Sequence, residues 1–223
     1  MTLTLSNPEK RRGWLYLFLQ MLAVPYAVGA LCRALGISSP ATANAVAFYT
    51  NGLLALMFFR ELLASSCRNV RWGRLLWVAA KGFGLYWALN LLTQLMIFAI
   101  KPDFSNINDP TITAMIREQP WLMSIAVVFF APLAEECLFR GWIFTGLAQR
   151  NLPLAYGVTA CFFSAAHILG YVGRYDPLTL LLCFLQYLGP SIALCFTCRK
   201  ADSLLAPMLL HMTINAIALI LTR

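Results

Sequence analysis

Seven apolar runs of about spanning length limit most strongly how this chain can fold. A helix needs about 20 apolar residues to cross a bilayer, and lipid offers no partners to an unpaired backbone group. Of the 223 residues, 60% are apolar and only 12% are charged. We therefore predict an all-α polytopic transmembrane helix bundle of about seven spans, or eight if one segment is broken or re-entrant. The expected spans are 13–35, 42–63, 73–100, 121–149, 152–169, 178–198 and 204–221.

No linker or low-complexity tract divides the chain, so residues 1–223 are expected to form a single integral membrane domain. Within it, 1–119 would supply three N-terminal helices and 120–222 the helices that carry the polar motifs. The first twelve residues are polar and the first apolar run is of full spanning length, so we expect that run to remain as a helix. The seven scattered cysteines indicate free thiols, and the Cys195/Cys198 pair lacks the setting of a redox motif.

Basic residues lie in short clusters between the apolar runs, which favours membrane orientation over nucleic-acid binding as the reason for the net charge of +8. An N-terminus in the cytoplasm of a multi-pass protein of the cell membrane places more of them inside. The inner set is Lys10, Arg11, Arg12, Arg60, Arg68, Arg71, Arg74, Arg150, Arg199 and Lys200. The outer set is Arg33, Lys101, Arg117, Arg174 and Arg223. The short chain suggests a prokaryotic source.

Three charged residues fall inside the fourth apolar run, where an ionisable group is costly unless it has a partner or a function. Glu136 and Arg140 are four residues apart, so they share one helix face and can form an ion pair that orients helices. Glu135 lies about 100° around the helix from its neighbour and has no local counter-charge. Glu135 is therefore expected to have a different partner.

The chain has two histidines, and each belongs to an i,i+4 pair: Phe163 with His167, and His211 with Asn215. Glu135 and His167 are both sixteen residues from a turn centred on Asn151, which predicts that they lie at the same depth. His211 is nearer to the preceding turn and is expected to be shallower by about 10 Å, unless residues 141–149 project beyond the bilayer.

A carboxylate beside an imidazole can take a proton from water and direct its oxygen to a peptide carbonyl. We assign this role to Glu135 and His167. A histidine and an asparagine amide can donate to the oxyanion that forms, and His211 and Asn215 suit that role. Two histidines and a carboxylate also form a common zinc set, so Glu135, His167 and His211 remain possible zinc ligands, although no H-E-x-x-H motif occurs.

In order along the chain, E-E-x-x-x-R at Glu135 to Arg140, F-x-x-x-H at Phe163 to His167 and H-x-x-x-N at His211 to Asn215 together resemble the CPBP family of intramembrane proteases. That family includes the type II CAAX prenyl endopeptidases and the bacterial Abi proteins. The resemblance implies an endopeptidase with the four catalytic residues named above. It leaves Glu136, Arg140 and Phe163 as supporting residues. Family members are described as metalloproteases or as glutamate-dependent, so the metal question stays open.

A non-catalytic protein is the main alternative, either one that confers bacteriocin self-immunity or one that binds peptides in the membrane. A transporter is less favoured, because the sequence shows no internal repeat. For a protease, the expected partners are the bilayer and a peptide or membrane-protein substrate. Candidates are peptide pheromones, bacteriocin leaders and segments of membrane proteins.

Overall fold

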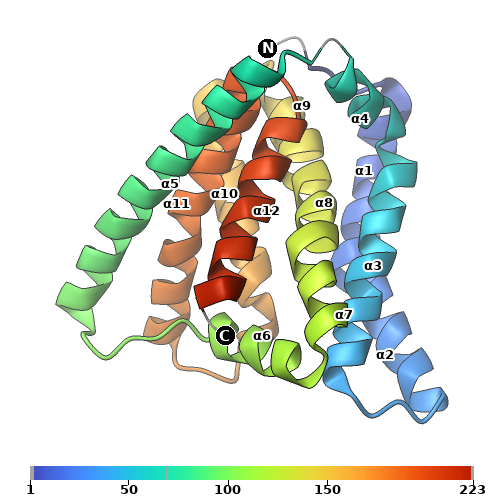
Figure 1. The fold of residues 1–223 in the computed structure, drawn as a ribbon, viewed down its shortest axis with the longest axis vertical. Coiled ribbons are helices and arrows are strands. Elements are labelled where there is room, and N and C mark those ends of the chain that lie inside the picture. The colour runs from blue at the N-terminus through green and yellow to red at the C-terminus, as the bar shows by residue number, and fades with distance from the viewer. Residues whose placement is uncertain (1–2, 69, 222–223) are drawn as a thin grey trace.

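The computed structural model describes residues 3–68 and 70–221, so Arg223 of the predicted outer set lies outside the described residues. Its described elements are all helices (Figure 1), and the predicted all-α polytopic bundle is confirmed. Six helical segments are long and apolar enough to cross a membrane, and Leu205–Leu221 is a shorter apolar helix. The six are Asn7–Ala34, Pro40–Phe58, Trp72–Ile100, Pro120–Ala148, Leu152–Tyr171 and Pro177–Ala201.

The first span begins at Asn7, before the predicted start at residue 13, because Ser6 and Glu9 form a capping box. The Ser6 side chain accepts from the Glu9 backbone N–H, and the Glu9 carboxylate accepts from the Ser6 backbone N–H. The span consists of α1 (Asn7–Phe18), the π-helical segment η1 (Leu19–Ala23) and α2 (Val24–Ala34).

The second predicted span, 42–63, is wrong at its end, because the helix breaks at Phe59. There α3 (Pro40–Phe58) gives way to the short α4 (Arg60–Cys67). The buried Glu9 carboxylate explains the break, since its Oε1 accepts a hydrogen bond of 2.8 Å from the backbone N–H of Leu62. An acidic side chain at a helix N-terminus pairs an otherwise unbonded N–H and favours a new helix start.

The third span, α5 (Trp72–Ile100), packs along α11 (Pro177–Ala201) and leans away from the remaining helices at its C-terminal end (Figure 1). The two helices approach closely at Gly82, where a β-carbon would lie 2.0 Å from Thr197 Oγ1. Asp176 caps the start of α11, and its carboxylate accepts hydrogen bonds from Thr179, which lowers the pKa of Asp176.

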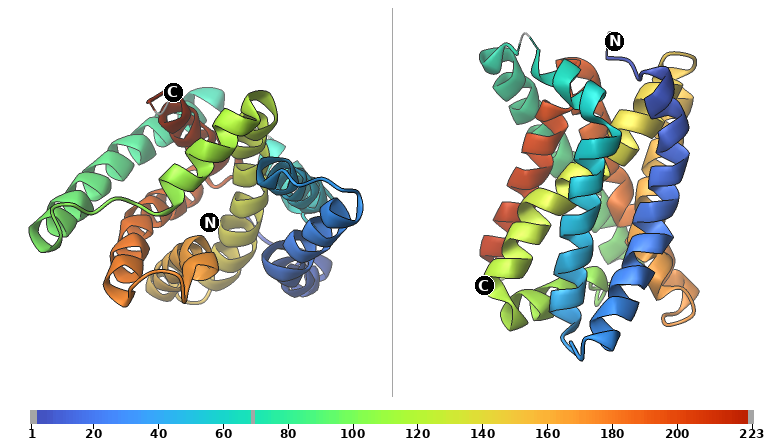
Figure 2. Two further views of the ribbon diagram at one scale, coloured as in Figure 1. Left: turned by 90° about the horizontal axis from the view of Figure 1, so that it is seen from below. Right: turned by 90° about the vertical axis from the view of Figure 1, so that its right-hand side faces the viewer.

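The stretch 101–120, which lies between two of the predicted spans, contains the helix α6 (Asn108–Glu118). This helix crosses the end of the bundle opposite the N-terminus (Figures 1 and 2). The Asn106 side chain precedes α6 and holds it to α11, since its Nδ2 donates to Gln186 Oε1 at 2.6 Å. Tyr171 donates to Asn108 Oδ1 at 3.0 Å and fixes the same end to the fifth span.

The fourth span is one continuous helix with two π-helical segments, which periodicity alone did not predict. The first π segment comes directly before Ala131 and Pro132, and η1 of the first span likewise comes directly before Val24 and Pro25. Proline lacks the N–H of the normal helical ladder, and a wider turn before it relieves the resulting strain. The fourth-span segments are α7 (Pro120–Ile125), η2 (Ala126–Phe130), α8 (Ala131–Glu135), η3 (Glu136–Phe144) and α9 (Thr145–Ala148). The remaining elements are α10 (Leu152–Ile168), η4 (Leu169–Tyr171) and α12 (Leu205–Leu221).

Candidate active site

The second glutamate of the fourth span lies in a polar cluster that is closed to solvent. Arg140 Nη1 lies 2.9 Å from Glu136 Oε1, the i,i+4 ion pair that the spacing predicts, and both side chains have no exposed surface. Arg140 Nη2 donates to Ser191 Oγ at 3.0 Å, which connects the pair to α11. The guanidinium also lies 4.4 Å from the centre of the Phe163 ring. Buried charges need several such partners to offset the cost of leaving water.

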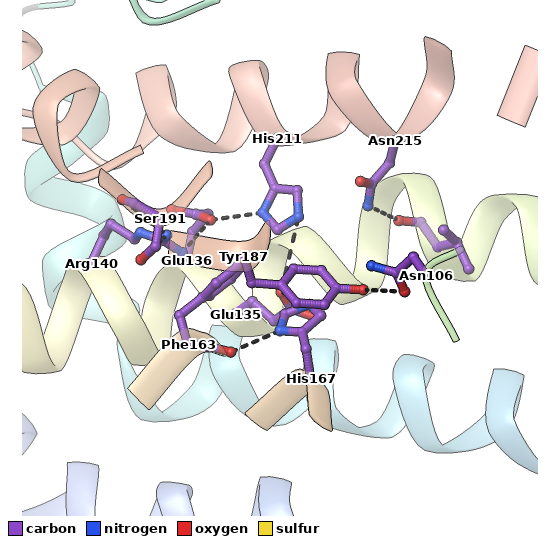
Figure 3. A network of polar contacts seen from close by, with 11 residues as sticks. Asn106, Glu135, Glu136, Arg140, Phe163, His167, Tyr187, Ser191, His211 and Asn215 are labelled. Atoms are coloured by element: carbon purple, nitrogen blue, oxygen red, sulfur yellow. Dashed lines mark hydrogen bonds and ion pairs between the residues drawn. The ribbon is translucent and has the colours of Figure 1, made fainter. Parts of the chain in front are cut away.

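His211 belongs to the same cluster, since its Nδ1 lies 2.7 Å from Glu136 Oε1 (Figure 3). Because Glu136 is already paired with Arg140, its carboxylate is the acceptor and the Nδ1–H of His211 is the donor. The expectation of a shallower His211 is wrong. Leu204, next to the start of α12, packs against Gly141, where a β-carbon would lie 3.3 Å from Leu204 Cδ1. Residues beyond Gly141 therefore extend past the start of α12, and His211 reaches the depth of Glu136.

Glu135 faces the other way, toward both histidines. Its Oε2 lies 3.9 Å from His167 Nε2 and 3.9 Å from His211 Nε2. Glu135 and His167, which are equally far in sequence from the turn at Asn151, thus lie close together, as predicted. Glu135 Oε2 has no hydrogen-bond partner among the described residues. The Glu135 side chain is 18% exposed, whereas the Glu136 side chain is 0% exposed. A water oxygen can lie within about 2.8 Å of this atom and of either imidazole nitrogen.

The orientation of His167 is fixed by its other ring nitrogen and by two aromatic rings. Nδ1 lies 2.8 Å from the Phe163 carbonyl oxygen, which can only accept, so Nδ1 carries the proton and the Nε2 lone pair faces Glu135. The Tyr187 ring stacks on the imidazole with 4.2 Å between the ring centres, and the Phe163 ring lies at 4.4 Å. Tyr187 and Ser191 were missed from the sequence, although they are four residues apart beside the Pro190 of an apolar helix.

Asn215 lies one turn beyond His211 on α12 and is held by the first π segment of the fourth span. In that segment the N–H of Ala131 bonds to the carbonyl of Ala126, which leaves the carbonyl of Val127 without its usual i+4 donor. Asn215 Nδ2 donates to this Val127 oxygen at 2.9 Å (Figure 3). One amide hydrogen of Asn215 is thus used to attach α12 to the fourth span, and its second hydrogen remains for another acceptor.

Glu135, His167 and His211 were considered as zinc ligands. Zinc holds nitrogen and oxygen ligands at about 2.0 to 2.2 Å, which places neighbouring ligand atoms about 3.4 Å apart in a tetrahedral site. The carboxylate oxygen is 3.9 Å from each imidazole nitrogen, and no group of three ligating side chains in the described residues has the spacing of a metal site. As they stand, these three side chains do not fit a zinc ion.

Two cavities meet at Glu135 and His167. The first, about 420 Å³, lies between α5, α6, α11 and α12 and also reaches His211 and Asn215. The second, about 450 Å³, lies between the first two spans, α6 and α10. Both are lined by Asn108 and Ile112 of α6, so this helix covers the two cavities at the end opposite the N-terminus.

Comparison with protein families gives a match for residues 117–217, the part that contains these helices, to the type II CAAX prenyl endopeptidase Rce1-like model. This part of the chain is therefore similar to an Rce1-like domain. The match confirms the recognition made from the ordered motifs, and it supports a CAAX-type protease of the membrane as the general activity of an Rce1-like domain. No curated protein and no solved structure matches the chain.

Proposed function

We propose that this Rce1-like protein is an intramembrane endopeptidase in which Glu135 and His167 activate the attacking water. The observation that supports this most directly is the Glu135 carboxylate oxygen, which is buried, has no hydrogen-bond partner in the described residues and lies 3.9 Å from two imidazole nitrogens. An unpaired buried acceptor of this kind costs free energy unless it binds a ligand or a water. Water held there is in contact with both a base and the cavities.

The peptide bond would be cleaved in two steps. Glu135, assisted by His167, removes a proton from water, and the oxygen attacks the scissile carbonyl carbon. His211 and the second amide hydrogen of Asn215 then donate hydrogen bonds to the oxyanion. For this, the His211 ring carries a proton on Nε2 as well as on Nδ1. Glu135 returns the proton to the leaving amine as the C–N bond breaks. Glu136 and Arg140 hold His211 in place through its Nδ1.

The substrate would be a peptide or a segment of a membrane protein. With the N-terminus in the cytoplasm of a prokaryotic cell membrane, α6 and both cavities lie nearer to the outer face, so the substrate would enter from that side. The distribution of the Lys and Arg residues over the loops supports this orientation.

Cleavage of a library of quenched fluorescent peptides by detergent-purified protein tests the proposal. The wild type, Glu135→Gln and His167→Ala are compared, each with and without a chelator. Loss of cleavage in both variants is expected, and sensitivity of the wild type to the chelator would show that a metal ion takes part. Peptide binding without cleavage in the wild type would contradict the proposal and favour a binding protein, such as one that confers bacteriocin immunity.

A further inference from the structure

The third span carries a polar stripe that the catalytic residues do not explain. Tyr86, Asn90 and Gln94 follow one another at four-residue spacing on α5, so they share one face of the helix, and all three line the first cavity. Neither the Asn90 nor the Gln94 amide makes a hydrogen bond with another described residue. Both side chains are only partly exposed.

Two unpaired carboxamides in a membrane-spanning helix are unfavourable unless they have a partner, because a polar group in hydrocarbon loses its hydrogen bonds to water. Their setting identifies the kind of partner. Across the same cavity, α12 presents the apolar Ile214, Ala218 and Leu219. One wall of the cavity can therefore hydrogen-bond and the other can pack against apolar groups. A peptide has both kinds of surface, whereas an isoprenoid or acyl chain would leave the amides unpaired.

The spacing along α5 matches an extended peptide. Residues four apart on a helix are separated by about 6 Å along its axis. Alternate residues of an extended strand are separated by about 6.8 Å. Each carboxamide can donate to a peptide C=O and accept from a peptide N–H. Asn90 and Gln94 can thus pair with main-chain groups two residues apart, without selecting a side chain.

We infer that the Asn90/Gln94 face of α5 binds the main chain of an extended peptide substrate on one side of the scissile bond. The inference rests on the proposed function, since the cavity that the stripe lines leads to Glu135 and His167. The second cavity shares these two residues and continues away from them. It has room for the chain on the other side of the bond, as an endopeptidase requires.

The first experiment uses one decapeptide that the wild type cleaves, and compares Asn90→Leu, Gln94→Met and the control Thr93→Val. The two test substitutions keep the approximate size of the side chain and remove its amide. Thr93 lies on the same helix and does not line either cavity, and its hydroxyl donates to the Leu89 carbonyl. For each test variant we expect KM to rise about fivefold to tenfold while kcat stays nearly constant. This is the result of losing one hydrogen bond that is equally strong in the ground state and in the transition state.

Changes in the substrate make the test specific. Replacement of single peptide bonds by esters removes one N–H at a time, and two replacements spaced two residues apart should each raise KM for the wild type. One of these esters should have little further effect on Asn90→Leu, and the other should have little further effect on Gln94→Met. Unchanged KM values in both variants, with cleavage intact, would overturn the inference and leave the proposed function standing.

A binding measurement separates the two proposals. The Kd of a fluorescent decapeptide that the wild type binds, whether or not it is cleaved, is measured for the wild type, Asn90→Leu and Thr93→Val. Weaker binding only in Asn90→Leu supports the inference even if no peptide is hydrolysed, in which case the proposed function alone fails. Tighter binding of a farnesylated peptide by Asn90→Leu than by the wild type would show that the cavity holds an isoprenoid chain, and would overturn the inference.

Discussion

Glu135 and Glu136 are neighbours in sequence but belong to two different regions of the molecule. Glu136, Arg140 and Ser191 form a closed cluster without exposed charged groups. Glu135 and His167 face the cavities, with a carboxylate oxygen that lacks a partner in the described residues. His211 contacts both regions, since Nδ1 bonds to Glu136 and Nε2 faces Glu135. The first region has its charges paired within the protein, although Glu136 Oε2 and Arg140 Nε have no hydrogen-bond partner among the described residues. The second region opens to the cavities and can hydrogen-bond to a ligand there.

The comparison shows how a membrane helix can separate stability from chemistry at adjacent positions. Successive residues of a helix are rotated by about 100°, so one carboxylate faces a packed interface and the next one faces a cavity. Substitutions in the closed cluster should therefore change the free energy of unfolding. Substitutions beside the cavities should change catalysis.

The largest effect is expected for Arg140→Met, which leaves the Glu136 carboxylate buried with less compensation. Removal of one member of a buried ion pair costs about 3 to 5 kcal/mol of unfolding free energy. Denaturant unfolding in detergent micelles measures this loss. The double variant Glu136→Gln/Arg140→Met removes both charges and should recover part of the stability. If the unfolding free energy of Arg140→Met equalled that of the wild type, the Glu136–Arg140 ion pair would not be shielded from solvent.

The next effect concerns Glu135→Gln, for which we expect cleavage to fall about 10³-fold while the melting temperature stays the same, because general-base catalysis contributes on this scale. Glu61→Gln is a matched control, since Glu61 lies on α4, is exposed and lines neither cavity. Peptide cleavage and thermal unfolding are measured on the same preparations. A large loss of stability in Glu135→Gln would remove the distinction between the two regions.

A smaller effect is expected for Ser191→Ala, because the hydroxyl accepts a hydrogen bond from the charged Arg140. Such bonds contribute about 2 kcal/mol. Ser164→Ala is the matched control, since the Ser164 hydroxyl is buried but has no hydrogen-bond partner in the described residues. Equal unfolding free energies for the two variants would argue against a role for Ser191 in the closed cluster.

The smallest effect is expected for Tyr187→Leu, which removes the ring that stacks on His167. Aromatic stacking contributes about 1 kcal/mol, so kcat should fall about fivefold with little change in stability. Tyr187→Phe keeps the ring and should retain nearly full kcat. If Tyr187→Phe instead lost as much activity as Tyr187→Leu, the hydroxyl and not the stacking would be what matters.

Much of the fold was predictable, because lipid forces long apolar runs to be helices and because hairpin arithmetic fixes relative depth. That arithmetic succeeded for Glu135 and His167, whose helices are joined by a short turn at Asn151. It failed for His211, since the level at which α12 begins is set by the contact of Leu204 with Gly141, a tertiary contact. The break at Phe59 similarly depends on Glu9, fifty residues away in sequence.

The supporting residues of the site were harder to predict for a different reason. A serine hydroxyl can bond to its own helix backbone, and Tyr187 is one of eight tyrosines in the sequence, so neither Tyr187 nor Ser191 stands out. The Asn90/Gln94 face was visible as a four-residue period but was not recognised. Histidine and glutamate are rarer inside membranes and gave a clear signal.

The π-helical segment before Pro132 has a consequence for the history of this site. Such a segment holds one residue more than the α-helical turn it replaces. Deletion of one residue from 128–130 would restore the α-helical turn and rotate the part of the span that precedes it by about 100° relative to Glu135, which would turn the Val127 carbonyl away from α12. Asn215 would then have nothing to hold. The attachment of α12 beside Glu135 and the two histidines thus amounts to a one-residue insertion, a step small enough for a single genetic event.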